Sequence, residues 1–593
     1  MLQRLSPVVS VLLLFLLTFQ LQSCRTDSQS SAEEVVAPEG PVTVSARLRG
    51  EPDRLSPYFT LRGFSRQVYR HIFPTLLDFN PSTMKLEPML AKALPTIEPI
   101  EEGPHAGGFA FSMEIKEQAV WDDGSPVLAS DYIFTLKMIN NPKIGGVTAV
   151  YRDAMSFIRD VEVDPDNPKK FTILTSSYYI QADQAVGVWV YPEYAYDPDG
   201  LLRDIPLVDL TDPDKAAALA ESNENLATFA ERIQDPKYTT DKDYLISCGA
   251  YRLDEWEKGQ RLVLKKKDNW WGNGLEKDAP LLSAYPEQIT YKIMADQNTA
   301  VTMVRDEGFD ILSSIPAGNF AELQESELVS KNYNFFTPFT TTYNYLGLNT
   351  NSPKLEDKRV RRALAHVFDA DKVIEVVNQG YGKKMSNPIP DMYDFHDSSL
   401  APIEFDAEKA RTLLAEAGWE DSNGDGTVDK VVDGTPTEMI LKYITTPGNT
   451  VGNNIALIYK EDAQKVGVTI ELVTMEINKL MEARARGEFE MFSARSGLDP
   501  SSYDPYQLWH TASSSNRSGF GDAESDALIE ELRTTLDKER RYALYKEFQQ
   551  LLREEQPIIL INLAQERILI HKKYKGATAT VLTPGFHPHF YHY

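Results

Sequence analysis

Two hydrophobic patterns alternate along most of this chain of 593 residues. Short runs such as 261–265 and 288–293 follow the alternating pattern of half-buried strands. Longer stretches such as 407–417 and 526–552 place apolar residues along one helical face, which predicts amphipathic helices. Strands that alternate with helices in this way indicate an α/β fold.

Acidic and hydroxyl residues mark where two of the expected helices begin. Ser130 and Asp131 precede the apolar stretch 132–139, and Asp369 and Asp371 flank the start of the stretch at 372–377. Such side chains accept hydrogen bonds from the free N–H groups of a first helical turn. We therefore expect helices to start at both places.

The N-terminal pattern predicts an exported protein. Arg4 precedes an apolar run at 8–19, which is too short for an ordinary membrane-spanning helix and is typical of a signal peptide, here 1–23. The following Leu-Gln-Ser-Cys at 21–24 resembles a bacterial lipobox. We expect cleavage before Cys24 and attachment of diacylglycerol to its sulfur. The alternative is a plain secretory signal with a chance cysteine.

Composition changes sharply after the leader. Residues 24–40 are rich in Ser, Glu, Asp and Pro, so we expect a flexible tether, with the folded body starting near Val42. The chain has two cysteines, and if Cys24 is acylated then Cys248 has no partner for a disulfide. Because 42% of the residues are hydrophobic, the body can be stabilised by its own core. We expect a monomer.

The charge balance excludes one class of partner. The formal net charge is −26, from 61 basic and 87 acidic side chains. Nucleic-acid binding needs clustered Lys and Arg, so we expect none. An acidic balance suits a soluble protein whose attachment to an anionic membrane surface is through its lipid alone.

Short motifs follow one another in a characteristic order from about Val42 to the C-terminus. They are Leu-Glu-Pro-Met-Leu-Ala at 86–91, Ala-Val-Trp-Asp-Asp-Gly-Ser-Pro at 119–126, Ser-Cys-Gly-Ala-Tyr-Arg-Leu at 247–253, Asn-Trp-Trp-Gly at 269–272, Tyr-Leu-Gly-Leu-Asn-Thr at 345–350, Asp-Lys-Arg-Val-Arg-Arg-Ala-Leu at 357–364 and Tyr-Asp-Pro at 503–505. This order resembles the family 5 extracellular solute-binding proteins, the dipeptide, oligopeptide and nickel binding components of ABC transporters.

The resemblance implies a two-lobed periplasmic-binding-protein fold of type II, the Venus-flytrap arrangement, with an additional third domain inserted into the first lobe and two strand-like crossovers. The expected boundaries are lobe I at 41–70, 200–347 and 559–593, the inserted domain at 71–199, and lobe II at 348–558.

The same resemblance implies a substrate-binding component of an ABC importer. It would capture a di- to oligopeptide by hinge closure and pass it to permease subunits, in the periplasm and anchored through Cys24. Cargo that contacts both lobes only when they are shut shifts the equilibrium toward the closed form. Neither a catalytic group nor a cofactor is needed.

A peptide offers an ammonium group for a carboxylate and a carboxylate for Arg, Lys or His. In the family the acid that meets the ammonium lies just before an Asp-Pro pair. We expect Asp499 to take this role and Asp504 to be a turn residue; the alternative is that both only cap turns before proline. Arg495 is a candidate for the cargo carboxylate, or for an ordinary ion pair.

Other candidates come from stretches that line the cleft in relatives, or from aromatic side chains near the motifs. Ordinary core packing is the alternative for each aromatic residue. The candidates are Ser56, Cys248, Gly249, Tyr251, Tyr343, Tyr503 and Trp509. Residues at Ser56-Pro57 and Cys248 depart from the family pattern, so the alternative cargo is an oligosaccharide, a nickel chelate or another small solute.

Two motifs suggest metal sites, although we expect no metal. The segment 421–429 places oxygen ligands at positions 1, 3, 5 and 9 of a calcium loop, but Val432 stands where the bidentate acid belongs. His587, His589 and His592 have ligand-like spacing, with packing or surface exposure as the alternative. A secreted hydrolase is a remote alternative function, since the sequence has no Gly-x-Ser-x-Gly elbow or His-Glu-x-x-His helix.

Overall fold

The structure is a computed structural model that describes residues 40–593. The predicted signal peptide, the lipobox with Cys24 and almost all of the predicted tether lie outside the described residues. Within 40–593, no helix combines the length and the apolar character needed to cross a bilayer.

A seven-stranded sheet joins both ends of the described chain. Across the sheet the strands are β12 (Tyr333–Phe336), β20 (Ile568–His571), β11 (Ile311–Leu312), β1 (Thr43–Leu48), β10 (Gln288–Ile293), β9 (Arg261–Lys266) and β8 (Tyr251–Glu257). Strand β1 is parallel to β10, and β10 is antiparallel to β9. The strands predicted at 261–265 and 288–293 are confirmed as β9 and β10.

A four-stranded sheet is formed by one continuous part of the chain. Its strands lie in the order β4 (Thr96–Pro99), β5 (Phe109–Glu114), β7 (Lys170–Thr175) and β6 (Ile158–Val163), and the hairpin of β2 (Leu77–Phe79) with β3 (Leu86–Pro88) precedes them. Helix α3 (Ala129–Asn140) begins where its sequence predicts. Asp131 in its first turn accepts the backbone N–H of Leu128 and the indole N–H of Trp121, both at 3.0 Å.

A five-stranded sheet forms the third large layer. The order is β17 (Thr469–Thr474), β16 (Ile440–Thr445), β18 (Met491–Gly497), β13 (Phe339–Leu348) and β19 (Ile558–Gln565). Buried residues of these strands share apolar clusters with helices α14 (Lys358–Val367), α16 (Ala407–Glu416) and α17 (Thr450–Gln464).

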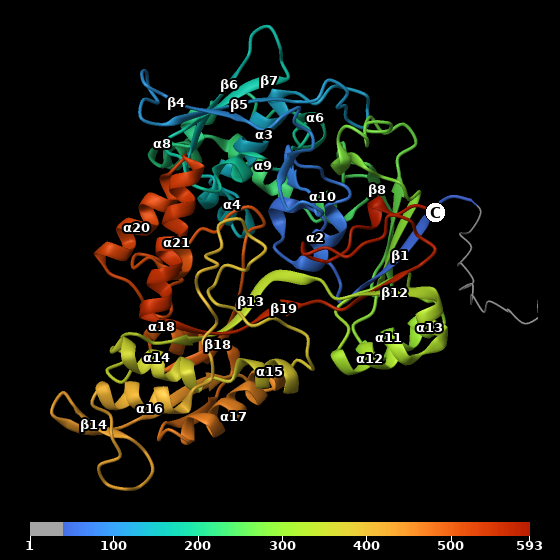
Figure 1. The fold of residues 1–593 in the computed structure, drawn as a ribbon. Coiled ribbons are helices and arrows are strands. Elements are labelled where there is room, and N and C mark those ends of the chain that lie inside the picture. Colours follow the sequence, from blue (N-terminus) through green and yellow to red (C-terminus); the bar gives the residue numbers. More distant parts are fainter. Residues whose placement is uncertain (1–39) are drawn as a thin grey trace, which may run out of the picture. The chain divides into compact units, whose positions relative to one another are not determined.

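Two short links join the seven-stranded sheet to the five-stranded sheet. Residues 337–338 connect β12 to β13, and residues 566–567 connect β19 to β20. The links lie side by side, since the N–H of Glu566 donates to the carbonyl of Pro338 at 3.0 Å (Figure 1). Strands β13 and β19 are also paired with each other. A change of angle between these two sheets must therefore pass through very few residues.

Two of the expected helices differ in how well the sequence predicted them. The stretch predicted at 526–552 is two helices, α20 (Ala523–Thr534) and α21 (Lys538–Glu555), so one continuous helix is wrong. The break occurs because Asp537 has extended backbone and accepts the N–H of Arg540 at 2.7 Å as the N-cap of α21. Helix α15 (Ala370–Val376) starts after its N-cap Asp369, as predicted.

Candidate functional site

Asp499 lies directly beyond the end of β18, on the five-stranded sheet. The preceding Leu498 is buried, and its N–H donates to the carbonyl of Thr341 in β13 at 2.9 Å. The carbonyl of Asp499 accepts the hydroxyl of Tyr393 at 3.0 Å. The backbone is thus held on both sides, which fixes the direction of the carboxylate.

The Asp499 carboxylate meets two amides from a distant part of the chain. The side-chain nitrogen of Gln181 donates to Oδ2 at 3.2 Å. Gln184, with its amide nitrogen turned inward, donates to both carboxylate oxygens at 3.0 Å. Both glutamines belong to the segment around α5 (Ala182–Val186). Within residues 40–593, Asp499 forms no ion pair with a Lys, Arg or His, so the groups that donate hydrogen bonds to its carboxylate are neutral amides.

The surroundings raise the pKa of Asp499 to about 6. Burial is the largest cause, because it disfavours the charged carboxylate, and the nearby Asp183 acts in the same direction. The hydrogen bond from Gln184 and the positive charge of Arg66 oppose this rise. Asp499 is therefore a half-buried carboxylate that a cationic group would stabilise.

Arg495 lies on β18, four positions before Asp499, and is opposite Asn344 of β13 in the register. Its side chain is exposed, and the described part of the chain offers it neither an ion pair nor a hydrogen bond. The alternative of an ordinary ion pair therefore has no partner in residues 40–593. Arg495 remains a predicted cargo contact.

Asp504 has a different environment. Its carboxylate forms an ion pair with Arg533 of α20 at 3.0 Å and accepts the N–H of Tyr506 at 3.0 Å. The latter contact is the turn geometry expected of Asp before Pro. The Arg533 guanidinium also lies 4.4 Å from the centre of the Tyr506 ring. These contacts are those of the turn residue that the sequence predicts.

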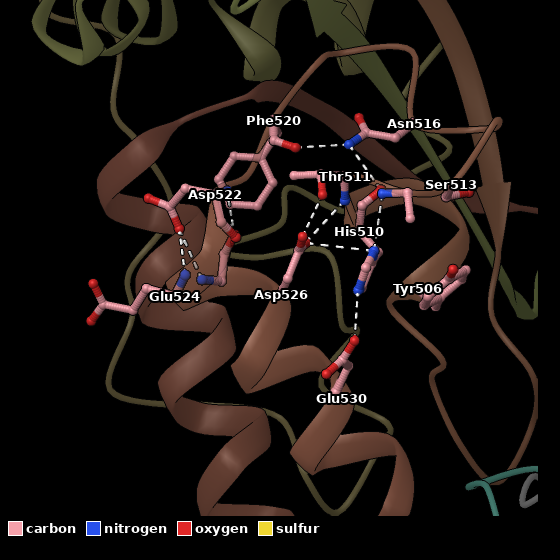
Figure 2. A network of polar contacts seen from close by, with 12 residues as sticks. Tyr506, His510, Thr511, Ser513, Asn516, Phe520, Asp522, Glu524, Asp526 and Glu530 are labelled. Carbon is pink, nitrogen blue, oxygen red and sulfur yellow. Dashed lines mark hydrogen bonds and ion pairs between the residues drawn. The ribbon is translucent and has the colours of Figure 1, made fainter.

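One face of α20 holds the loop that follows Asp504. Asp526, Glu530 and Arg533 are spaced so that they share a helical face. Figure 2 shows Asp526 and Glu530 on either side of His510, and Asp526 also accepts the N–H of Thr511 at 2.9 Å. The loop between β18 and α20 is thus attached to a rigid helix.

The three aromatic candidates pack inside the protein. Tyr343, Tyr503 and Trp509 are each less than 5% exposed and belong to the same apolar cluster of the five-stranded-sheet region. The indole N–H of Trp509 donates to the Tyr503 hydroxyl, and the backbone N–H of Tyr503 donates to the Tyr545 hydroxyl at 2.9 Å. Their environment is the core packing that the sequence left open as the alternative.

Ser56, Cys248 and Tyr251 are also buried, and their contacts are with residues far from Asp499. The hydroxyl of Ser56 is 2.6 Å from that of Tyr191, and Tyr251 donates to the carbonyl of Pro286 at 2.9 Å. Burial raises the pKa of the Cys248 thiol, which makes the thiolate unfavourable. None of these side chains contacts Asp499 in the structure.

Gly249 is a point of close backbone approach. A Cβ atom there would lie 2.0 Å from the carbonyl oxygen of Ile72, so only glycine fits.

Gly249 and Tyr251 line a cavity of about 40 Å³ together with three histidines, His71, His587 and His589. Burial lowers the pKa of all three, that of His589 to about 3, so these imidazoles are neutral.

The two motifs that suggest metal sites do not form such a site in the structure. Within residues 40–593, no group of three or more His, Cys, Asp or Glu side chains is arranged to hold an ion. In the loop 421–429 the Asp421 carboxylate instead accepts three backbone N–H groups, those of Gly424, Asp425 and Gly426. The tail histidines diverge, since the His592 ring packs on Tyr285.

Sequence reasoning missed the residues that surround Asp499 from other parts of the chain. These are Arg66 of α2 (Gly63–Tyr69), and Gln181, Asp183 and Gln184 around α5. The only local signal is a group of polar side chains within an otherwise small and apolar stretch. No spacing links that stretch to a residue more than three hundred positions later.

Comparisons with known proteins agree with this architecture. The family model described as "Bacterial extracellular solute-binding proteins, family 5 Middle" matches residues 85–519. The oligopeptide-binding protein AppA of Bacillus subtilis is 22% identical over 585 residues, which cover 97% of this chain and 96% of that protein.

Solved structures show the same fold. A structure of AppA from Bacillus subtilis in complex with a nonapeptide has a TM-score of 0.65 and 20% identity, covering 93% of this chain and 99% of the other. NikA from Brucella suis, in complex with Fe(III)-EDTA, has a TM-score of 0.70 and 19% identity, with the same coverage. Similar folds in this group are therefore reported with chemically different ligands.

Proposed function

Since the chain belongs to the family 5 bacterial extracellular solute-binding proteins, we propose that it captures a peptide for an ABC importer, with Asp499 as the acceptor of the peptide ammonium. The observation that carries this proposal is the Asp499 carboxylate, half-buried at the junction of two parts of the chain and met only by neutral amides among the described residues. A buried carboxylate without a cation is unfavourable, and a bound ammonium group would remove that cost.

Arg495 supplies the complementary charge. Four positions of extended backbone separate it from Asp499, which corresponds to at most about 13 Å between Cα atoms. A short peptide has its two terminal charges at a comparable separation when extended. An exposed guanidinium without a protein partner at that distance suits the peptide carboxylate. The pair Asp499 and Arg495 therefore favours a zwitterionic cargo over a neutral sugar.

We propose the domain organisation on the basis of the sheets. The seven-stranded sheet would form lobe I, the five-stranded sheet lobe II, and the four-stranded sheet the inserted domain at 71–199. Because β13 pairs with β18 from Thr342 onward, lobe II would include residues that the sequence assigned to lobe I before 348. The links at 337–338 and 566–567 would be the hinge.

The attachment to the membrane is proposed from the sequence alone. The Leu-Gln-Ser-Cys motif supports lipidation of Cys24 on an exported chain, and permease subunits would receive the cargo. Mass spectrometry of the protein extracted from its membrane tests the anchor directly. We expect an N-terminal Cys24 with a diacylglyceryl mass, and an unmodified N-terminus would contradict the anchor without affecting the cargo proposal.

The cargo is tested with a matched pair of peptides. We expect tetra-alanine to bind, and N-acetyl tetra-alanine to bind at least tenfold more weakly, because acetylation removes only the positive charge that Asp499 would accept. Isothermal titration calorimetry measures both affinities. Equal affinities would contradict the role of Asp499.

Native mass spectrometry of protein purified from cells gives an unbiased second measurement. We expect co-purified masses that fit peptides. A carried-over sugar or metal chelate would overturn the peptide proposal while leaving the family membership intact.

A further inference from the structure

The segment 178–184 of the inserted domain contacts lobe II through Tyr179, Ile180, Gln181 and Gln184. We infer that this segment, which we name the jaw, closes the cleft over Asp499, and that Gln181 and Gln184 are positioning residues for cargo held by that carboxylate. The inference rests on the proposed function for its cargo, but the closing contact itself is independent of what the cargo is.

The centre of the jaw is apolar. Ile180 is only 6% exposed and belongs to the apolar cluster that contains Leu498, Tyr503 and Trp509 of lobe II. Met84, from the β2–β3 hairpin of the inserted domain, packs against the same cluster. A side chain of one domain that is buried in the core of another becomes exposed to water when the two separate, which opposes opening.

Two polar side chains of the jaw, Tyr179 and Asp183, lie near arginines of lobe II. The Arg533 guanidinium lies 5.8 Å from the centre of the Tyr179 ring and 4.4 Å from that of Tyr506, so it stands between aromatic rings from opposite domains. Arg533 is held there by Asp504. Arg541 of α21 acts on the other side, where its positive charge opposes the rise in the pKa of Asp183 that burial causes.

The glutamines connect this closing contact to the cargo site. Gln181 and Gln184 flank Asp183, and both donate to the Asp499 carboxylate, at 3.2 and 3.0 Å. A carboxylate has room for about four hydrogen bonds, so the three contacts from the two amides leave about one acceptor position for an ammonium group. The shut jaw therefore aligns the acceptor and excludes water from it without occupying every acceptor position.

The consequence for affinity follows from populations. If only the shut form binds cargo tightly, the apparent affinity is reduced in proportion to the fraction of molecules that are shut. Loss of both amides removes all three of these hydrogen bonds to a charged group. We expect this loss to weaken binding about tenfold.

The test combines scattering with affinity. In the variant Gln181→Ala/Gln184→Ala we expect small-angle scattering without cargo to show an expanded profile, and tetra-alanine to bind about tenfold more weakly. The control is Gln260→Ala, because Gln260 is exposed, and its backbone supplies the only hydrogen bonds found for it in the described chain. The control should match the wild type in both measurements, and circular dichroism checks that each variant is folded.

Ile180→Ser provides a second way to open the jaw that leaves the amides in place. We expect the same expanded profile, because a hydroxyl replaces an apolar contact with lobe II. Coincident wild-type and double-variant profiles, or an expanded profile with wild-type affinity, would overturn the inference. If tetra-alanine does not bind to the wild type, the proposed cargo is wrong, and the scattering profiles alone test the jaw. Expanded profiles of the variants would support the jaw, and profiles that coincide with that of the wild type would overturn it.

Discussion

Asp499-Pro and Asp504-Pro are the same dipeptide five positions apart, yet the fold gives them opposite environments. Asp504 pairs with Arg533 of α20 and accepts a backbone N–H, so its charge is compensated by a neighbouring helix. The carboxylate of Asp499 accepts hydrogen bonds only from amides of the segment around α5, and its pKa is raised to about 6. A carboxylate with a cation stabilises the protein itself, while a carboxylate without one is available to a ligand.

The largest effect on binding should come from Asp499→Asn. The amide keeps the shape but removes the charge, so we expect tetra-alanine to bind between about ten- and a hundredfold more weakly. The same substitution should raise the melting temperature at pH 7.5, because it removes a half-buried charge that has no cation. Calorimetric titration and thermal unfolding measure the two changes, and a fall in both would place Asp499 in the structural class of Asp504.

The next effect is a loss of affinity in acid. The pKa of Asp499 lies near 6, so the carboxylate is mostly ionised at pH 7.5 and mostly protonated at pH 5. We expect tetra-alanine to bind about tenfold more weakly at pH 5 than at pH 7.5, because the protonated form cannot pair with an ammonium group. Calorimetric titrations between pH 5 and pH 7.5 measure how the affinity depends on pH. The affinity of Asp499→Asn should not show this dependence.

The loss of affinity in acid must be distinguished from a loss of stability that three buried histidines cause in the same pH range. His71, His587 and His589 are buried and neutral, with pKa values below that of an unfolded histidine. The unfolded chain therefore takes up protons first, so stability is fully present above about pH 6.5 and declines as the pH falls. Thermal unfolding at each pH shows where the fold is intact. If the affinity falls only at those pH values where the melting temperature also falls, the pH dependence would not support a role for Asp499 in binding.

The smallest effect should be that of Asp504→Asn. It weakens the contact with Arg533, and we expect a loss of about 1 kcal/mol of unfolding free energy and a lower melting temperature. Affinity for tetra-alanine should change by less than about threefold, because the Asp504 carboxylate is already paired with Arg533. Urea unfolding and calorimetry give both numbers, and a tenfold loss of affinity with unchanged stability would reverse the assignment of the two aspartates.

Much of the fold was predictable because its signals are local. The alternating runs at 261–265 and 288–293 are strands, and the starts of α3 and α15 lie where Asp131 and Asp369 satisfy free N–H groups. The predicted α/β fold of a family 5 solute-binding protein is confirmed by the family match and the solved structures. The single helix over 526–552 was wrong because the cap at Asp537 outweighed a continuous apolar face.

The sequence by itself determined the family, the main elements and the stretch in which the cargo acid was expected, because each depends on neighbouring residues or on motif order. Only the tertiary structure decided which acid is left without a cation, and which aromatic side chains are enclosed in the core. Gln181 and Gln184 are more than three hundred positions from Asp499 and carry no motif. Their contact exists because folding brings two distant segments together, and pairing across such a distance leaves no trace in the local pattern of either segment.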